Sequence, residues 1–163
     1  KDVAAREAQR RQGDVPASLL EVLGRVGDAQ ALAKNTQFGS CVFANKPGDG
    51  SAREQAASCQ KVLGGWANIA VEYATKRYRS NLINWGMLPF LTDADHEALP
   101  FKNGDYIFVP NVRKAVEEKK DVINAYVVGD ELKEIQLKLG DLTDAERQII
   151  LDGCLINYYK ATK

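Results

Sequence analysis

The chain has 163 residues, 45% of them hydrophobic, so one domain with a sizeable core is expected and disorder is not. Lys plus Arg and Asp plus Glu both number 22, so no net charge favours nucleic acid or an anionic membrane as a partner. No apolar run approaches the roughly 20 residues of a membrane span, and no signal-peptide pattern opens the sequence.

Predicted helices and strands alternate in the first half of the chain. Residues 1–14 are charged and rich in Ala, Arg and Gln, so we expect a linker or frayed helix there and the domain proper over 15–163. Residues 15–26 fit a short helix or a strand. Next come a buried strand over 38–43, a helix over 51–63, a strand over 66–73, a helix over 79–85 and a strand over 87–91.

The second half predicts a hairpin followed by a helix. Thr143 and Glu146 have the spacing of a capping box, which would open a final helix over 144–159 that Gly153 interrupts. This order of elements indicates an α/β domain with a mixed sheet. Before the final helix we expect one or two helical turns over 93–99, a strand over 106–109, a surface helix or loop over 112–120, and hairpin strands over 123–128 and 132–139.

The three cysteines and the single histidine suggest no metal site. Cys41, Cys59 and Cys154 match no C-x-x-C spacing, and we expect buried, reduced thiols in a cytoplasmic protein. His96 lies in a charged turn without suitably spaced ligands, so it is assigned no role.

The segment Gly48–Glu54 joins a predicted strand to a predicted helix and has the composition of an anion site. Its glycines let the backbone approach a ligand closely, and free N–H groups at a helix start attract anions. Arg53 adds a planar guanidinium suited to a carboxylate or phosphate. Ser51 and Glu54 have capping-box spacing, so an ordinary capped helix is the alternative interpretation.

Several separated motifs resemble those of the aconitase family. Residues 50–57 have the sequence GSAREQAA, similar to the family's GSSREHA signature. The other matching pieces, in the same order and at nearly the same spacing, are LGG at 63–65, RSNLINWGMLP at 79–89 (family RSNLINxGxLP), Glu146, and GCLIN at 153–157. Together they span roughly residues 38–159, and the agreement of separate motifs makes the resemblance specific.

The resemblance implies the family's C-terminal swivel domain, a mobile lid with a three-layer swivelling β/β/α fold. It implies a lyase that hydrates and dehydrates a di- or tricarboxylic hydroxy acid, with a [4Fe–4S] cluster on companion domains whose iron acts as a Lewis acid. This chain is then expected to bind no cofactor itself and to be inactive alone. Its partners would be the cluster-bearing domains of the same protein or a large subunit, together with the carboxylic-acid substrate.

Site residues follow from the same resemblance. Ser51 matches the family's serine base, which acts as an alkoxide, and Arg53 matches its substrate-binding arginine. Gly50 and Ala52 occupy neighbouring substrate-binding positions. Because a serine hydroxyl is a weak base at neutral pH, the helix-start N–H groups and Arg53 would have to stabilise the alkoxide.

Departures from the family pattern indicate a divergent branch and leave two alternatives open. Ala52 replaces the family's second serine, and no arginine lies between Arg25 and Arg53 to match another substrate-binding arginine. The chain could instead be the small subunit of a heterodimer that resembles isopropylmalate isomerase. It could also be a non-catalytic swivel module with a binding or regulatory role.

Overall fold

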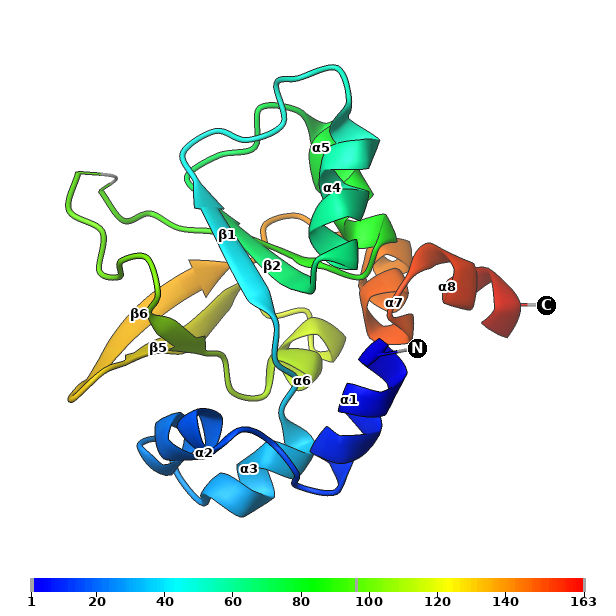
Figure 1. The fold of residues 1–163 in the computed structure, drawn as a ribbon. Helices are drawn as coiled ribbons and strands as arrows, with labels where there is room; N and C mark the ends of the chain where they lie inside the picture. Colours follow the sequence, from blue (N-terminus) through cyan, green and yellow to red (C-terminus); the bar gives the residue numbers. More distant parts are fainter. Residues whose placement is uncertain (1, 96, 163) are drawn as a thin grey trace. The chain divides into compact units, whose positions relative to one another are not determined.

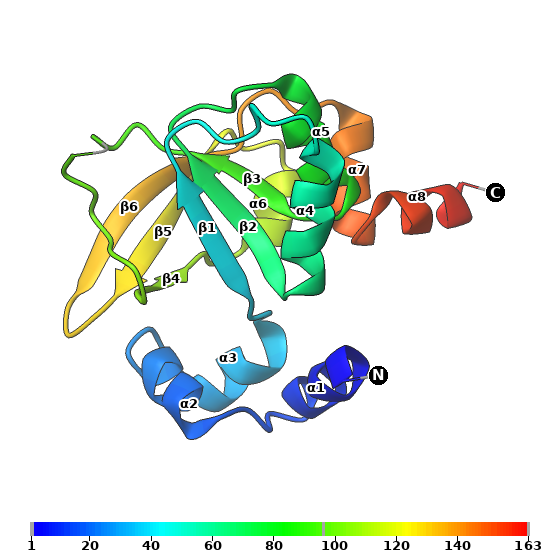
Figure 2. The ribbon, with the colours of Figure 1, turned by 45° about the horizontal axis from the view of Figure 1, so that its top comes forward.

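The computed structural model describes residues 2–95 and 97–162, so His96 lies outside the described residues. The described strands form a single mixed sheet in the order β1-β2-β3-β6-β5-β4, in agreement with the predicted α/β class (Figures 1 and 2). Neighbours β1, β2 and β3 run parallel, whereas β3 with β6 and β4 with β5 run antiparallel. The strands are β1 Ser40–Ala44, β2 Gly65–Ala70, β3 Leu88–Leu91, β4 Tyr106–Phe108, β5 Val122–Val128 and β6 Leu132–Lys138.

The chain divides into two compact units. The smaller contains Lys1–Phe38, Pro100–Phe108 and Tyr126–Ile135, and the larger contains Gly39–Leu99, Val109–Ala125 and Gln136–Lys163. The helices of the smaller unit are α1 Asp2–Arg11, α2 Ala17–Gly24 and α3 Ala29–Asn35. Those of the larger are α4 Arg53–Val62, α5 Lys76–Asn84, α6 Val112–Glu117, α7 Asp144–Asp152 and α8 Leu155–Ala161.

A buried arginine ties together the helices of the smaller unit. Arg10 of α1 pairs with Glu7 and donates two hydrogen bonds of 2.9 Å, to the carbonyl oxygens of Lys34 and Thr36. These carbonyls belong to the end of α3, where backbone acceptors lack helical partners. Residues 15–26 contain a helix, α2, and not a strand. Helix α3 was not predicted from the sequence. The proposed domain start at residue 15 stays a prediction.

Helices α4 and α5 pack on each other and on strands β2 and β3 of the larger unit (Figure 2). The alternation of apolar strands and amphipathic helices predicted this layer, because each element must bury its apolar face. The fully buried side chains at its centre are Ile69, Leu82, Ile83, Met87 and Phe90.

A polar cluster lies inside this core between α4, α5 and β2. The Tyr78 hydroxyl accepts hydrogen bonds from the side-chain amides of Gln60 at 3.0 Å and Asn68 at 3.1 Å. The amide oxygens of Gln60 and Asn68 are buried without a partner among the described residues. Because a phenol also carries one proton, turning either amide over would give that proton an acceptor and complete the network. The cluster fixes Tyr78, which is 2% exposed, at the start of α5.

Two glycines allow the end of α5 to approach the α7–α8 junction. Gly86 has φ +69°, and a Cβ there would lie 1.9 Å from the carbonyl oxygen of Gly153. Gly153 itself has φ +89° and ends α7. The predicted helix end at Gly86 and helix interruption at Gly153 are both confirmed. The close contact requires glycine at position 86, whereas the left-handed φ of +89° favours glycine at position 153.

Two sequence-based expectations about burial are wrong. The strand expected to be buried, β1, is an edge strand whose first three residues are exposed. Cys41 and Cys59 are exposed and Cys154 is half-buried, although all three are free thiols. The residue Cys41 as a whole is exposed because β1 is an edge strand with one neighbouring strand. Its thiol group is nevertheless desolvated, which raises the pKa of the thiol to about 11. Of the one or two helical turns predicted over 93–99, one hydrogen-bonded turn is present among the described residues, in which the Ala98 amide donates to the Asp95 carbonyl at 3.0 Å. Residue 96 of this segment lies outside the described residues.

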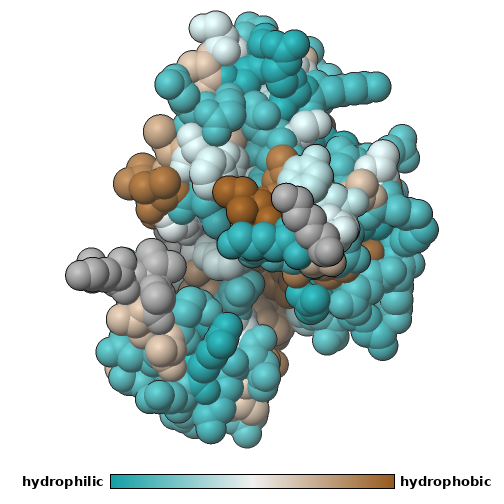
Figure 3. All heavy atoms as spheres, turned by 90° about the vertical axis from the view of Figure 1, so that its right-hand side faces the viewer, coloured by the Kyte–Doolittle hydropathy of each residue, from teal (hydrophilic) through white to brown (hydrophobic). Residues whose placement is uncertain are grey.

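Several large hydrophobic side chains of the larger unit are exposed. Val62 and Leu63 at the end of α4 are 76% and 84% exposed, and Ile156 and Tyr159 of α8 are also exposed. The face drawn in Figure 3 is mainly hydrophilic, with a few small hydrophobic patches. In the described part of the chain, every helix is too short or too polar to cross a bilayer.

The glycine contact can be tested by substituting two glycines that share an unusual backbone angle. Gly64→Ala adds a Cβ at φ +94° with no heavy atom within 4 Å, so it should cost only the left-handed strain of about 1–2 kcal/mol. Gly86→Ala adds the collision with the Gly153 carbonyl and should cost about 1–3 kcal/mol more. Urea unfolding of both variants measures the difference, and equal losses would contradict the close approach.

Candidate active site

Two loops meet at the carboxyl ends of the parallel strands of the larger unit. Residues 45–52 connect β1 to α4, and residues 71–75 connect β2 to α5. The amides of Glu72 and Ala74 donate to the carbonyls of Asn45 and Pro47, at 3.0 and 2.9 Å. The carboxyl edge of parallel strands is where α/β proteins bind ligands.

An exposed ion pair adds to the contact between the loops. Lys46 of the first loop pairs with Glu72 of the second, and this hydrogen bond raises the pKa of the Lys46 ammonium. Both side chains are largely exposed, so the pair contributes little to stability. The backbone hydrogen bonds therefore hold the loops together.

Gly48 is the point at which the first loop rests on the core. Its φ is +100°, and a Cβ there would lie 2.5 Å from Cβ of Tyr78, so only glycine fits without displacement. Its carbonyl oxygen accepts from Arg53 Nε at 3.0 Å and from the Thr75 hydroxyl at 3.2 Å. The loop is thus fixed by one glycine contact and two side-chain donors.

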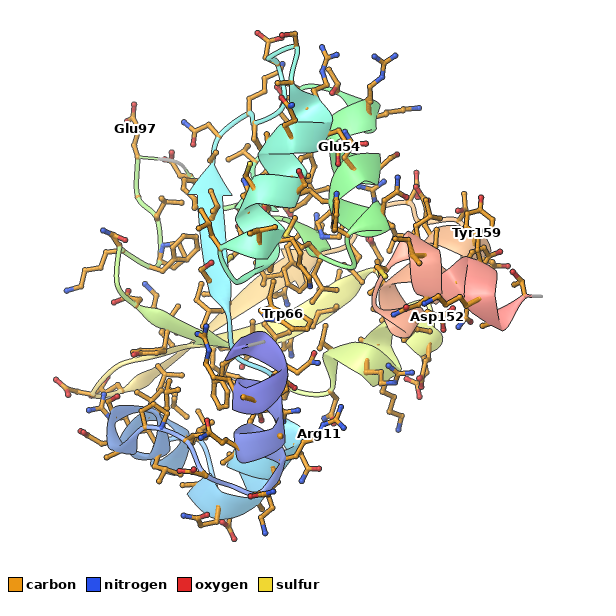
Figure 4. All side chains as sticks on the ribbon, turned by 45° about the vertical axis from the view of Figure 1, so that its right-hand side comes forward. Arg11, Glu54, Trp66, Glu97, Asp152 and Tyr159 are labelled. Carbon is orange, nitrogen blue, oxygen red and sulfur yellow. The ribbon has the colours of Figure 1, made fainter. Side chains whose placement is uncertain are left out.

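The capping box predicted for Ser51 and Glu54 does not form. Helix α4 begins at Arg53, so its N-cap is Ala52 and Ser51 lies one residue too early to cap it. Glu54, labelled in Figure 4, instead accepts a hydrogen bond from Trp85 Nε1 at 3.2 Å. The second predicted box is confirmed, because Thr143 and Glu146 exchange both hydrogen bonds at the start of α7.

The missing cap leaves donors available at the start of α4. Among the described residues, no side chain accepts a hydrogen bond from the first N–H groups of this ten-residue helix. Ser51 is exposed, and its hydroxyl has no hydrogen-bond partner within residues 2–95 and 97–162. Unpaired N–H groups at a helix start carry partial positive charge and bind anions. A carboxylate at this helix start would find both the N–H groups and a free hydroxyl.

Arg53 is held at one nitrogen and free at the others. The residue is half-buried, and its Nε donates to the Gly48 carbonyl. For the part of the chain that the structure describes, Nη1 and Nη2 have no partner. A guanidinium tied through Nε keeps its Nη1 and Nη2 edge for a carboxylate, in the paired geometry that arginine favours.

The structure brings the predicted site residues together on one loop and helix start. Gly50 and Ala52 flank Ser51, and both are exposed. A Cβ at Gly50 would meet nothing within 4 Å, so this position is open. Thr75 and Tyr78, which support the site loop, were not among the predicted site residues. A threonine directly before a helix is the usual N-cap pattern and could have identified Thr75.

The described residues include no candidate metal site. Across the described ranges, no three His, Cys, Asp or Glu side chains are grouped so that they could hold a metal ion. The expectation that this chain binds no cofactor itself stays a prediction.

Comparisons with known proteins place the chain in a family. The aconitase C-terminal domain profile matches residues 7–95, more than half of the chain, and the chain therefore belongs to the aconitase family. The solved structure of a 3-isopropylmalate dehydratase from Methanocaldococcus jannaschii is similar to it, with 27% identity and a TM-score of 0.55. That similarity covers 93% of this chain and 86% of the other. Among proteins with curated descriptions, none matches this chain.

The family and the fold define what kind of protein this is. The predicted swivel-type α/β fold is confirmed. The chain is a swivel domain of an aconitase-like hydro-lyase, or a small subunit of the isopropylmalate isomerase type.

The site loop can be tested with two glycines that lie two residues apart. Gly48→Ala should destabilise the chain by about 2–4 kcal/mol, because left-handed strain adds to the clash with Tyr78. Gly50→Ala should be neutral or stabilise by up to about 1 kcal/mol, since open space surrounds it and the unfolded chain loses entropy. Urea unfolding measures both, and a harmless Gly48→Ala would refute the seating of the loop on Tyr78.

Proposed function

We propose that Ser51 is the base and Arg53 the carboxylate-binding residue in a reversible dehydration of a di- or tricarboxylic hydroxy acid. One observation carries this proposal. In the part of the chain that the structure describes, an exposed serine hydroxyl without a hydrogen-bond partner lies beside an uncapped helix start, two residues from a guanidinium that is anchored through Nε alone. The family membership of the chain supports the reaction class.

The chemistry needs a proton acceptor and a stabilised anion. The Ser51 alkoxide takes the proton alpha to a carboxylate, and the electron pair of that C–H bond forms the new double bond as hydroxide departs from the neighbouring carbon. Negative charge grows on the carboxylate as the proton leaves. The Nη1 and Nη2 donors of Arg53 stabilise that charge, and the N–H groups of α4 stabilise the alkoxide.

Departure of the hydroxide is assigned to partner domains. We propose that these domains carry a [4Fe–4S] cluster, that this chain binds no cofactor, and that it is inactive alone. The partner is the rest of the same protein or a separate large subunit, and the setting is cytoplasmic. Ala52 removes a hydroxyl donor that the family's second serine supplies, so a substrate with a different polar group at this position fits the site better.

A separate small subunit is the second candidate function. The similarity in fold to the 3-isopropylmalate dehydratase structure, at 27% identity and a TM-score of 0.55, supports this candidate. Turnover assays of the chain with its cluster-bearing partner distinguish the two: activity on 2-isopropylmalate supports the subunit type, and activity on citrate supports the aconitase type.

The base role of Ser51 is tested in the complete enzyme with its cluster-bearing partner. Ser51→Ala should lower kcat by about 10²–10⁴-fold, because the proton acceptor is lost. The control is Ser58→Ala, the same change within α4, at a hydroxyl that donates to the Gln55 carbonyl. Steady-state kinetics measure both variants, and turnover near wild type in Ser51→Ala would remove Ser51 from the base role.

The carboxylate role of Arg53 predicts an effect on substrate affinity. Arg53→Lys should raise KM by about 10- to 100-fold, since a lysine cannot make the paired contact and charged hydrogen bonds are strong. Arg113→Lys, on the exposed surface of α6, is the matched control and should leave KM unchanged. If KM stays constant in Arg53→Lys as well, the substrate carboxylate does not bind at Arg53.

A further inference from the structure

A single backbone carbonyl in the site loop joins the starts of two helices. The Gly48 oxygen accepts from Nε of Arg53, the first residue of α4, and from the hydroxyl of Thr75, the N-cap of α5. A carbonyl oxygen has two lone pairs, so both bonds can form at once. The two donors are 22 positions apart in the chain and meet only at this atom.

The Thr75 hydroxyl both accepts and donates a hydrogen bond. Its oxygen accepts from the Tyr78 amide at 3.2 Å, which caps α5, and its proton goes to Gly48. A continuous series of hydrogen bonds therefore runs from the Tyr78 amide through the Thr75 hydroxyl to the Gly48 carbonyl, which Arg53 also contacts. Tyr78 is itself fixed by the buried amides of Gln60 and Asn68. The series thus begins at a rigid point in the core.

The Gly48 carbonyl needs a second hydrogen-bond donor because glycine leaves the following peptide free to rotate. With φ +100°, Gly48 lies where other residues are strained, and the same freedom lets the peptide that follows it rotate. Rotation would turn the carbonyl away from Arg53 and release Nε. The Thr75 hydroxyl opposes that rotation because it holds the same oxygen from a second element.

We propose that Thr75 is a positioning residue that orients the Arg53 guanidinium through the shared Gly48 carbonyl. With Nε held, the Nη1 and Nη2 edge keeps one direction for a substrate carboxylate. This inference rests on the proposed carboxylate role of Arg53 for its functional meaning. The orientation itself depends only on the three hydrogen bonds at Gly48 and Thr75.

The variants separate positioning from helix capping. Thr75→Val keeps the shape of the side chain but loses both the cap and the bond to Gly48, whereas Thr75→Ser keeps both. Thr143→Val is the matched control, because it removes the N-cap of α7 without a contact to the site loop. Thr75→Ala is a second variant in case valine crowds the loop.

The first measurement is NMR hydrogen exchange at the Arg53 Nε–H of the 163-residue chain, assigned by its disappearance in Arg53→Lys. Thr75→Val and Thr75→Ala should speed this exchange by about three- to tenfold, the factor expected for one lost hydrogen bond. Thr75→Ser should restore slow exchange, and Thr143→Val should leave it at the wild-type rate. Wild-type exchange in both Thr75→Val and Thr75→Ala, or equal acceleration in Thr143→Val, would overturn the proposal.

The second measurement keeps this proposal distinct from the proposed function. Tricarballylate, a tricarboxylate without a hydroxyl, is titrated into the same variants and followed through the Arg53 signal. Weaker binding in Thr75→Val, rescued in Thr75→Ser, supports positioning for carboxylate recognition. If tricarballylate leaves the Arg53 signal of the wild type unchanged while exchange still depends on Thr75, the carboxylate role of Arg53 fails and the positioning by Thr75 stands.

Discussion

The candidate site depends on the seating of one glycine against one tyrosine ring. Gly48 can approach Tyr78 because it has no Cβ, and Tyr78 cannot move because its hydroxyl is bound by two buried amides. Because a protein interior is densely packed, Tyr78 has little room to move, and the position of Gly48 is fixed with it. The loop, the start of α4 and the guanidinium of Arg53 thereby take their positions from the core, although Ser51 itself is exposed.

The same arrangement explains why the motif residues are close in sequence yet need distant support. Residues 50–53 supply the groups proposed for chemistry, whereas the residues that hold them come from the loop after β2 and from α5. Loops at the carboxyl ends of parallel strands vary easily and so carry function, while the strands beneath them stay fixed. The contact between Gly86 and Gly153 stabilises the structure beneath the loops, because it joins the end of α5 to the α7–α8 junction.

Local patterns predicted much of the fold and part of the site. The alternating strands, the hairpin and the capping box at Thr143 were all evident, because each is set by neighbours in the chain. The capping box at Ser51 failed because the anchoring of Gly48 places the helix start one residue later, at Arg53. Strand β1 is apolar but lies at the sheet edge, and strand order is not encoded in a local pattern. For the same reason the exposure of Cys41 was not predictable.

The uncapped start of α4 has an energetic consequence for a lid. A serine or threonine cap would stabilise the free protein by about 1 kcal/mol, and α4 forgoes that contribution whenever nothing occupies its first turn. If a carboxylate binds there as proposed, it would restore that contribution, and the ligand-bound domain would be more stable than the free one. By this proposal, α4 would reach its full stability only when the domain closes over a bound carboxylate.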